Sequence, residues 1–554
     1  MEQARFILAI TLSFIVLLVW QMMLPPPEEV NNQEVSSNQA EEKLTTEKLP
    51  VTPGLEVPGL DESRPMEDLA KIPQSLPNRD PRTITIETPL YVAQLTEKGA
   101  AFDSFLLKEY FETMDENSLF KEILSTELTR TSLINLKKNN ELNLADVIYT
   151  VNYEGSKLSV NSPKQISFSF TSNYGIVFTK TYSFYPDTYQ IGLTVSIANY
   201  SSKSINDSLL VSLKKPSPKK STYIFEGPAA LINSSLMEIN LDDIEEQNSF
   251  LGKIQWIALE DRYFATGLIP KKVSESNLSV FVVNKVMEAR LEEPSMNISP
   301  GTESTYEYDL FFGPKSINLL SKINNDFAKI IDFGWFDIIA KPFLHLMITM
   351  YRFLPNYGLA IILLTILVKL IFWPLGNKSY ESMKEMKKIQ PHIERIRHRY
   401  KDDRKKMNEE IMILYRSYKV NPLSGCLPMI IQIPVFIAFY RMLYQAIELR
   451  HAPFILWIKD LSAPDRLGDF GFSIPFMDDP CGIPFLTIVM GASMFIQQKM
   501  SPPPGDPSQA KIMMLMPIFM TVIFINFPAG LVLYWLVNNV ASILQQHYIN
   551  KRSN

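Results

Sequence analysis

The stretch Tyr357-Gly-Leu-Ala-Ile-Ile-Leu-Leu-Thr-Ile-Leu-Val-Lys-Leu-Ile-Phe-Trp-Pro-Leu375 decides the fold class. It is 19 residues long, which is enough for a helix to cross the hydrocarbon core of a bilayer. Lys369 lies inside it, and an ammonium at the centre of a spanning helix costs roughly 2.5–3.5 kcal/mol. Such charges usually face a wet cavity or a partner, so Lys369 is the first candidate for function. The alternative is snorkelling, since Leu375 is only about 9 Å farther along a helix.

The remainder of the chain is divided in composition. Residues 25–330 are polar and acidic, whereas residues 333–550 contain most of the long apolar runs. A length of 554 residues allows a water-exposed domain beside a membrane part. The two cysteines, Cys426 and Cys481, lie in separate segments, and no Cys/His spacing typical of a metal site occurs. We therefore predict neither a metal site nor a cofactor.

A second apolar run of 19 residues extends from Phe6 to Leu24 and is followed by prolines and glutamates. The apolar core of a cleaved signal peptide is normally shorter and ends at a small-residue cleavage site. We therefore predict an uncleaved transmembrane anchor over residues 1–24. Residues 25–82 are rich in Pro, Glu, Asn, Gln and Ser, which predicts a flexible linker.

Apolar and polar residues alternate in the region that follows. The pattern is clearest at Ile166, Phe168 and Phe170 and again at Ile191, Leu193, Val195 and Ile197. Alternation of this kind places apolar side chains on one face of a strand, so we predict an all-β sandwich over residues 83–330. The region has no nucleophile elbow or phosphate loop, which favours a scaffold or interaction module. Paired carboxylates have no sequence signature, so an enzyme built on them stays an alternative.

The C-terminal part alternates between apolar segments and polar connections. Residues 331–354 carry aromatic, aliphatic and charged residues, which predicts an amphipathic helix in the membrane interface. The predicted membrane helices are the anchor, residues 355–376, residues 422–449, and three more within residues 484–550. Residues 450–483 form an acidic loop, and residues 551–554 form a short tail. The expected fold is thus a polytopic α-helical membrane protein of six spans with an inserted β-domain.

Residues 377–421 predict a helical hairpin between the second and third spans. Apolar residues recur there at spacings of three and four: Met383, Met386, Ile389, Ile393, Ile396 and Tyr400, then Met407, Ile411, Leu414 and Tyr418. Two narrow apolar stripes joined by a short charged turn indicate an antiparallel coiled coil. The segment holds 13 Lys/Arg against 7 Asp/Glu. An excess of Lys/Arg in short loops marks the cytoplasmic side, so both termini are expected inside and the β-domain outside.

Polar residues interrupt several predicted spans, namely Thr365, Gln432, Asn526, Asn538 and Asn539. Unsatisfied polar groups are costly in lipid, so these side chains should point inward or pair with one another. With Lys369 they indicate a hydrophilic patch inside the bilayer, and the alternative is interhelical hydrogen bonding alone. The apolar cores of the spans contain no Asp or Glu, which argues against a proton-coupled pump.

Several motifs resemble the YidC family of membrane protein insertases. They are Lys369-Leu-Ile-Phe-Trp-Pro-Leu375, Val420-Asn-Pro-Leu-Ser-Gly-Cys-Leu-Pro428, Trp457-Ile-Lys-Asp-Leu461 and Phe527-Pro-Ala-Gly-Leu-Val-Leu-Tyr-Trp535. The resemblance implies a five-helix insertase core, a periplasmic β-supersandwich, and a groove open to the cytoplasm and to lipid that carries a positive charge. By position the groove charge is Lys369, and its groove neighbours are Thr365, Gln432, Asn526 and Trp535. The family typically has Arg at the charged position, and often Tyr and Trp where this chain has Trp535 and Asn526.

The resemblance also implies a function. The expected role is a non-enzymatic insertase and chaperone of the bacterial inner membrane, acting on nascent membrane proteins alone or with the Sec translocon. The basic hairpin residues Lys387, Lys388, Arg395, Arg399 and Lys405 are expected to recruit the client, and the ribosome or signal recognition particle machinery are further candidate partners; DNA is not. Hydrophobic transfer of the client into lipid would drive insertion without nucleotide hydrolysis. The runner-up is a secondary transporter with Lys369 as ligand, although the internal symmetry common in transporters is missing from the sequence.

Overall fold

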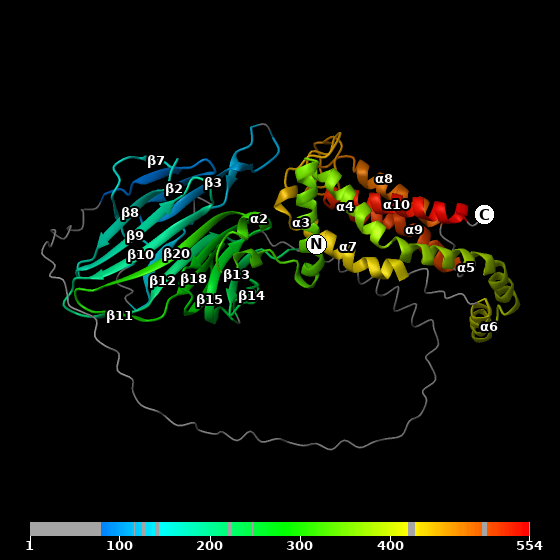
Figure 1. The fold of residues 1–554 in the computed structure, drawn as a ribbon, viewed down its shortest axis with the longest axis horizontal. Coiled ribbons are helices and arrows are strands. Elements are labelled where there is room, and N and C mark those ends of the chain that lie inside the picture. The colour runs from blue at the N-terminus through cyan, green and yellow to red at the C-terminus, as the bar shows by residue number, and fades with distance from the viewer. Residues whose placement is uncertain are drawn as a thin grey trace, which may run out of the picture. The chain divides into compact units, whose positions relative to one another are not determined.

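The computed structural model describes residues 79–115, 117–124, 129–138, 143–218, 224–245, 247–418, 427–500 and 507–552. Within these residues, strands occupy the chain from Thr83 to Pro314 and helices occupy it from Ile317 to Arg552 (Figure 1). The prediction of a β-rich domain followed by a helical core is therefore confirmed. The anchor predicted over residues 1–24 and the linker up to residue 78 lie outside the described residues.

The first of the sheets has the strand order β4-β3-β2-β1-β7. Its strands are β1 (Thr83–Glu87), β2 (Tyr91–Thr96), β3 (Ala101–Phe111), β4 (Phe120–Glu122) and β7 (Lys157–Ser159). All neighbours are antiparallel except β1 and β7, which run parallel. A two-stranded sheet of β11 (Ile205–Asp207) and β19 (Met296–Ile298) lies apart from it.

The large sheet runs in the order β5-β12-β18-β17-β15-β16-β20-β10-β9-β8-β6, with β13 and β14 attached to β15. Its strands are β5 (Leu133–Leu136), β6 (Thr150–Val151), β8 (Lys164–Thr171), β9 (Ile176–Phe184), β10 (Gln190–Asn199), β12 (Leu209–Pro216), β13 (Gly227–Ile232), β14 (Ser235–Glu238), β15 (Ser249–Glu260), β16 (Phe264–Pro270), β17 (Glu275–Val283), β18 (Val286–Glu292) and β20 (Glu303–Pro314). β15 joins two halves of this sheet, because residues 249–253 pair with β17 while its C-terminal part pairs with β13 and β16.

The two larger sheets share an aromatic core. Phe102 of β3 has its ring 5.2 Å from that of Phe312 on β20 and 5.2 Å from that of Tyr182 on β9. Phe105 of β3 also contacts Phe312, at 5.1 Å. The alternation of buried and half-buried residues along β9 and β10 matches the period-two pattern of the sequence. The buried residues of β9 and β10, most of them apolar, thus lie on the inner face of the domain.

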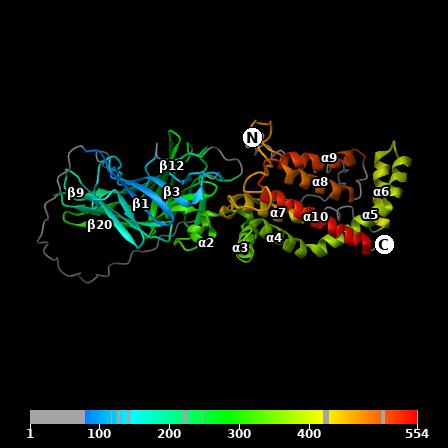
Figure 2. The ribbon, with the colours of Figure 1, turned by 90° about the horizontal axis from the view of Figure 1, so that it is seen from above.

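The helical part begins with short elements and continues with long helices (Figures 1 and 2). The short elements are α2 (Ile317–Leu320), η1 (Phe327–Ile330), η2 (Gly334–Phe336) and, later, η4 (Ile447–Leu449). The long helices are α3 (Asp337–Phe353), α4 (Tyr357–Ile371), α5 (Trp373–Arg399), α6 (Arg404–Ser417), α7 (Leu427–Gln445), α8 (Phe485–Met500), α9 (Pro507–Phe524) and α10 (Ala529–Arg552). α10 packs against both α4 and α8, and α8 also packs on α9.

The segment predicted as one helix over residues 355–376 forms two helices in the structure. α4 and α5 meet at Phe372 with a bend of 64°. Pro374 in the first turn of α5 accounts for the break, because proline has no N–H to continue the hydrogen-bond ladder of α4 and its ring clashes with the preceding turn. No single helix among the described residues is both long enough and apolar enough to cross a membrane. The bent pair α4 and α5, taken together, is long enough and apolar enough to do so.

α5 and α6 form the hairpin expected from the two apolar stripes. Ile389, Ile393 and Ile411 make a small buried cluster between the helices, with Met386, Ile396, Met407, Leu414 and Tyr415 packed around it. This cluster is separate from the main apolar core, which includes residues of the β-domain and of the other helices. The hairpin is therefore stabilised mainly by its own contacts.

Candidate functional site

The site is centred on Lys369 in the last turn of α4. Its side chain is only 8% exposed, and its ammonium donates a hydrogen bond to the Ser542 hydroxyl of α10, with 2.7 Å between Nζ and Oγ. Thr365 lies one turn earlier and is buried, and its hydroxyl donates to the carbonyl of Ile361 within α4. Among the described residues, the ammonium has no acidic partner. A buried charge is costly unless it is paired or fully hydrogen-bonded, so an ammonium with a single neutral partner is a candidate binding group.

α10 supplies a row of polar side chains to this site. Asn539, Ser542, Gln545 and Gln546 are all buried and follow one another at the spacing of a single helix face. Gln545 donates to the carbonyl of Trp373 at 2.9 Å and to Oδ1 of Asn377 at 2.8 Å, both on α5. We call these four residues the α10 polar row.

Two further members of the α10 polar row contact the region of α8. Asn539 donates to the Ser493 hydroxyl at 3.0 Å, and Gln546 donates to the carbonyl of Met500 at 2.9 Å. The side-chain oxygens of Gln545 and Gln546 are buried and have no hydrogen-bond partner within the described residues. A buried acceptor without a donor is costly, so these oxygens favour water or another polar group in the site.

Close packing of the helices depends on Gly376 in α5. A Cβ atom at this position would lie 2.7 Å from Nε2 of Gln545. The glycine therefore lets the Gln545 amide reach the α5 backbone next to the bend. A side chain at residue 376 would push α10 away from the α4–α5 bend.

The other predicted groove residues lie on different helices from Lys369, or in the connections between helices, with the exception of Thr365. Trp535 lies two turns before Ser542 on α10, and its ring packs against Phe436 of α7 at 4.7 Å and Phe524 of α9 at 4.9 Å. Gln432 is half-buried on α7. Of the five residues predicted for the groove, the structure brings Thr365 to Lys369 and supports Trp535 from α7 and α9. The role of each in a groove stays a prediction.

Asn526 is placed differently from the sequence expectation. The sequence puts it inside an apolar span, but α9 ends at Phe524, and Asn526 lies in the turn before α10. Its Oδ1 accepts from Arg466 and from the backbone N–H of Asp478, and its Nδ2 donates to the carbonyl of Phe476. Asn526 thus anchors the loop over residues 450–483. It lies about 20 Å from Ser542 along the axis of α10.

Sequence reasoning missed Ser542, Gln545 and Gly376 as parts of the site. The signal that could have found the first two is the polar spacing Asn539, Ser542, Gln545 in a helix that otherwise begins as an apolar run. The partnership of Ser542 with Lys369 joins residues 173 positions apart, so no local pattern announces it.

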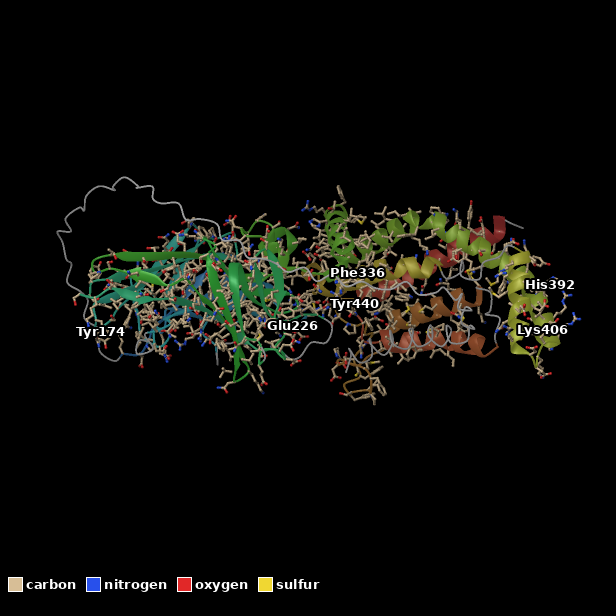
Figure 3. The ribbon with its side chains drawn as sticks, turned by 90° about the horizontal axis from the view of Figure 1, so that it is seen from below. Tyr174, Glu226, Phe336, His392, Lys406 and Tyr440 are labelled. Atoms are coloured by element: carbon tan, nitrogen blue, oxygen red, sulfur yellow. The ribbon has the colours of Figure 1, made fainter. Side chains whose placement is uncertain are left out.

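The basic residues predicted for recruitment lie on the outside of the hairpin. Lys387, Lys388, Arg395, Arg399 and Lys405 are all exposed. Lys388 pairs with Glu385 at 2.6 Å, and Arg395 lies 3.1 Å from Nδ1 of His392. Figure 3 shows His392 and Lys406 at the hairpin with their side chains at its surface. The hairpin therefore presents cations to solvent and isoleucines to its own interior.

Comparison with known proteins covers both parts of the chain. The family model described as the YidC periplasmic domain matches residues 83–346, and the one described as 60Kd inner membrane protein matches residues 349–554. The membrane protein insertase YidC of Syntrophus aciditrophicus is 39% identical over 99% of this chain and 99% of its own length. That of Syntrophobacter fumaroxidans is 37% identical over the full length of both.

A solved structure described as an active YidC insertase with its first transmembrane domain resolved covers 85% of this chain and 93% of that chain, at 18% identity and a TM-score of 0.38. The TM-score is too low for this match to bear on the fold. The two full-length relatives are sufficient by themselves, because their identity extends through the β-rich domain and the helical core alike. The chain therefore belongs to the YidC family of membrane protein insertases.

Proposed function

We propose that this chain inserts membrane proteins by presenting the Lys369 ammonium to a hydrophilic segment of the client within a groove bordered by α4, α5 and α10. Membrane protein insertion is the activity for which the full-length relatives are named. The observation that carries the mechanism is the buried ammonium held by a hydroxyl beside the α10 polar row. Thr365, Gln432 and Trp535 are the further groove residues of the proposal, whereas Asn526 is left out because its amide is bonded to the loop over residues 450–483.

The proposed mechanism begins with a polar, often acidic, tail of a nascent chain. The Lys369 charge attracts the tail, and the amides and hydroxyls of the groove replace part of its hydration. A client span gains about 0.8 kcal/mol for each CH₂ group transferred to lipid. A single Asp in the membrane centre costs about 2.5–3.5 kcal/mol. A few buried aliphatic side chains therefore offset one translocated carboxylate, and no nucleotide is needed.

The topology of the proposal follows from charge and from the family. The exposed cations of the α5–α6 hairpin favour a cytoplasmic position for the hairpin and for both termini, and the name of the family model that matches the β-domain supports a periplasmic position for that domain. Six spans with a five-helix core complete the arrangement. The hairpin would receive the client and contact the ribosome or targeting machinery, and the Sec translocon would be a partner for larger clients.

The test of this proposal compares Lys369→Ala and Lys369→Arg in reconstituted vesicles. The client is offered with an acidic tail and, in a matched version, with each Asp replaced by Asn. We expect Lys369→Ala to lower insertion of the acidic client about tenfold, which corresponds to about 1.4 kcal/mol. Lys369→Arg should keep most of the activity, because the charge is retained.

Lys378→Ala is the matched control, since Lys378 is exposed on α5 nine residues farther on. It should insert both clients at the rate of the unchanged protein. Full insertion of the acidic client by Lys369→Ala would show that the groove charge has no electrostatic role. Equal loss of both clients would show that Lys369 acts through packing alone.

A further inference from the structure

The hydroxyl of Ser542 lies where α10 meets both arms of the bent pair α4–α5. It accepts a hydrogen bond from Lys369 of α4 at 2.7 Å. It also interacts with the Tyr380 hydroxyl of α5. Its own proton goes to the carbonyl of Asn538, one turn earlier on α10, at 2.7 Å. One small side chain therefore touches both sides of the bend.

We propose that Ser542 is a positioning residue for Lys369, which fixes the ammonium against α10 and keeps its charge available to a carboxylate of the client. This inference rests on the proposed function of Lys369. It assigns to α10 the orientation of the ammonium, which the position of Lys369 on α4 does not determine by itself.

The hydrogen-bonding capacity of Ser542 supports this role. A serine hydroxyl has one proton to donate and two lone pairs that accept. The proton is committed to the carbonyl of Asn538, which orients the hydroxyl. The lone pairs are then directed away from the α10 backbone, and one of them accepts from Lys369. The hydroxyl is thus preset as an acceptor for the ammonium.

The neutrality of the partner matters as much as its position. A carboxylate at residue 542 would neutralise Lys369, whereas a hydroxyl leaves the positive charge intact. An ammonium has three N–H donors, and within the described residues Lys369 uses one of them, on Ser542. Two donors therefore remain for the two oxygens of an arriving carboxylate. The class of group that fits the site is a carboxylate of the client tail.

Without this contact the Lys369 side chain could adopt a different rotamer and extend toward water. Its stem has four rotatable bonds, and a lysine near the end of an apolar helix extends toward water when nothing holds it. The helix α4 ends two residues after Lys369, at Ile371. Gln545, one turn after Ser542, fixes the other arm by bonding Trp373 and Asn377. α10 therefore directs the ammonium on one side of the bend and holds the first turn of α5 on the other.

The experiment measures insertion of the acidic client and of its Asn-substituted version by the full chain in vesicles, and takes their ratio. Within one preparation the ratio is independent of how much protein is folded. We expect Ser542→Ala to lower the ratio about fivefold while it changes insertion of the neutral client less than about twofold. Ser542→Thr retains a hydroxyl and should restore most of the ratio.

Thr487→Ala is the matched control, because Thr487 is a buried hydroxyl residue of α8 whose Oγ1 has no hydrogen-bond partner within the described residues. It should keep the ratio of the unchanged protein. An unchanged ratio in Ser542→Ala, or equal losses for both clients, would overturn the positioning role. If Lys369→Ala lowers the ratio and Ser542→Ala does not, this inference alone fails. If neither lowers it, the proposed role of Lys369 fails as well.

Discussion

At the scale of single residues, the β-domain contains a completely buried lysine with a different role from that of Lys369. Lys180 of β9 is 0% exposed, and its ammonium donates to the carbonyls of Gly99 at 3.2 Å, Ala100 at 2.6 Å and Ser132 at 2.6 Å. These three acceptors have left-handed backbone angles, with φ of 72°, 45° and 59°. The chain turns there, and the lysine of a neighbouring sheet supplies the donor that a regular strand partner would give.

Replacement of this lysine by methionine should destabilise the β-domain. Lys180→Met keeps the approximate length of the side chain but removes the donor to the carbonyls of Gly99 and Ser132. The carbonyl of Ala100, in contrast, keeps the hydroxyl of Tyr182 as a donor. We expect the free energy of unfolding to fall by about 3 kcal/mol. Urea denaturation followed by tryptophan fluorescence measures it, since Trp256 is fully buried in this domain. Lys164→Met on the exposed side of β8 is the control and should change stability little.

A stability of Lys180→Met equal to that of Lys164→Met would contradict the structural role of the buried ammonium. The two lysines also contrast in their partners. Lys180 spreads its donors over three backbone carbonyls, whereas Lys369 bonds one hydroxyl within the described residues. All three N–H donors of Lys180 are thus used, whereas Lys369, by its contacts in the described part of the chain, keeps two donors for a carboxylate of the client.

At the scale of elements, the sequence predicts local periodicity well and long-range partners poorly. The stripes through Ile389, Ile393 and Ile411 predict a hairpin because each contact partner lies on a regular helix face. The alternation in β9 and β10 predicts their buried faces for the same reason. The bend at Phe372 depends on Pro374 alone. The long apolar run around this proline predicts one continuous helix, so the break is missed from the sequence. The partners of the α10 polar row cannot be inferred from such periodicity, since they lie on α4, α5 and α8.

The hairpin should act as a separable recruitment element. Its core is independent of the main core, so replacing Lys387, Lys388, Arg395, Arg399 and Lys405 by Gln should leave both folded. We expect client insertion to fall several-fold because the basic surface would no longer attract acidic partners. Reconstituted insertion and circular dichroism measure the two properties. Raising the salt concentration should lower insertion by the unchanged protein toward that of the variant.

The control for this prediction keeps the charges and breaks the hairpin core. Ile393→Asp places a carboxylate in the cluster with Ile389 and Ile411, so the two helices should separate while the cations remain. Normal insertion by the charge-free variant would exclude electrostatic recruitment. Loss in Ile393→Asp but not in the charge-free variant would assign the role to the shape of the hairpin instead.

At the scale of the whole molecule, arginines join the β-domain to the helices in both directions. Arg262, between β15 and β16, donates through Nε to the carbonyl of Tyr444 at 2.6 Å, and its guanidinium lies 3.7 Å from the centre of that ring. Arg450, after α7, donates to the carbonyls of Phe111 and Glu112 at the end of β3. Its guanidinium also lies 5.5 Å from the ring centre of Phe264. Each part thus contributes one cation to the surface of the other.

The contacts of Arg262 and Arg450 are expected to attach the β-domain to the helices without contributing to client insertion at the groove. Arg262→Ala removes a charge-assisted hydrogen bond and a cation–π contact, which together contribute about 2 kcal/mol. Amide hydrogen exchange of residues 441–450 should therefore accelerate more than about tenfold. Arg290→Ala is the control, since Arg290 pairs with Glu288 within its own sheet. Insertion by Arg262→Ala should stay within about twofold of the unchanged protein, because the contact of Lys369 with α10 remains. Strong loss of insertion with unchanged exchange would instead place Arg262 on the path of the client.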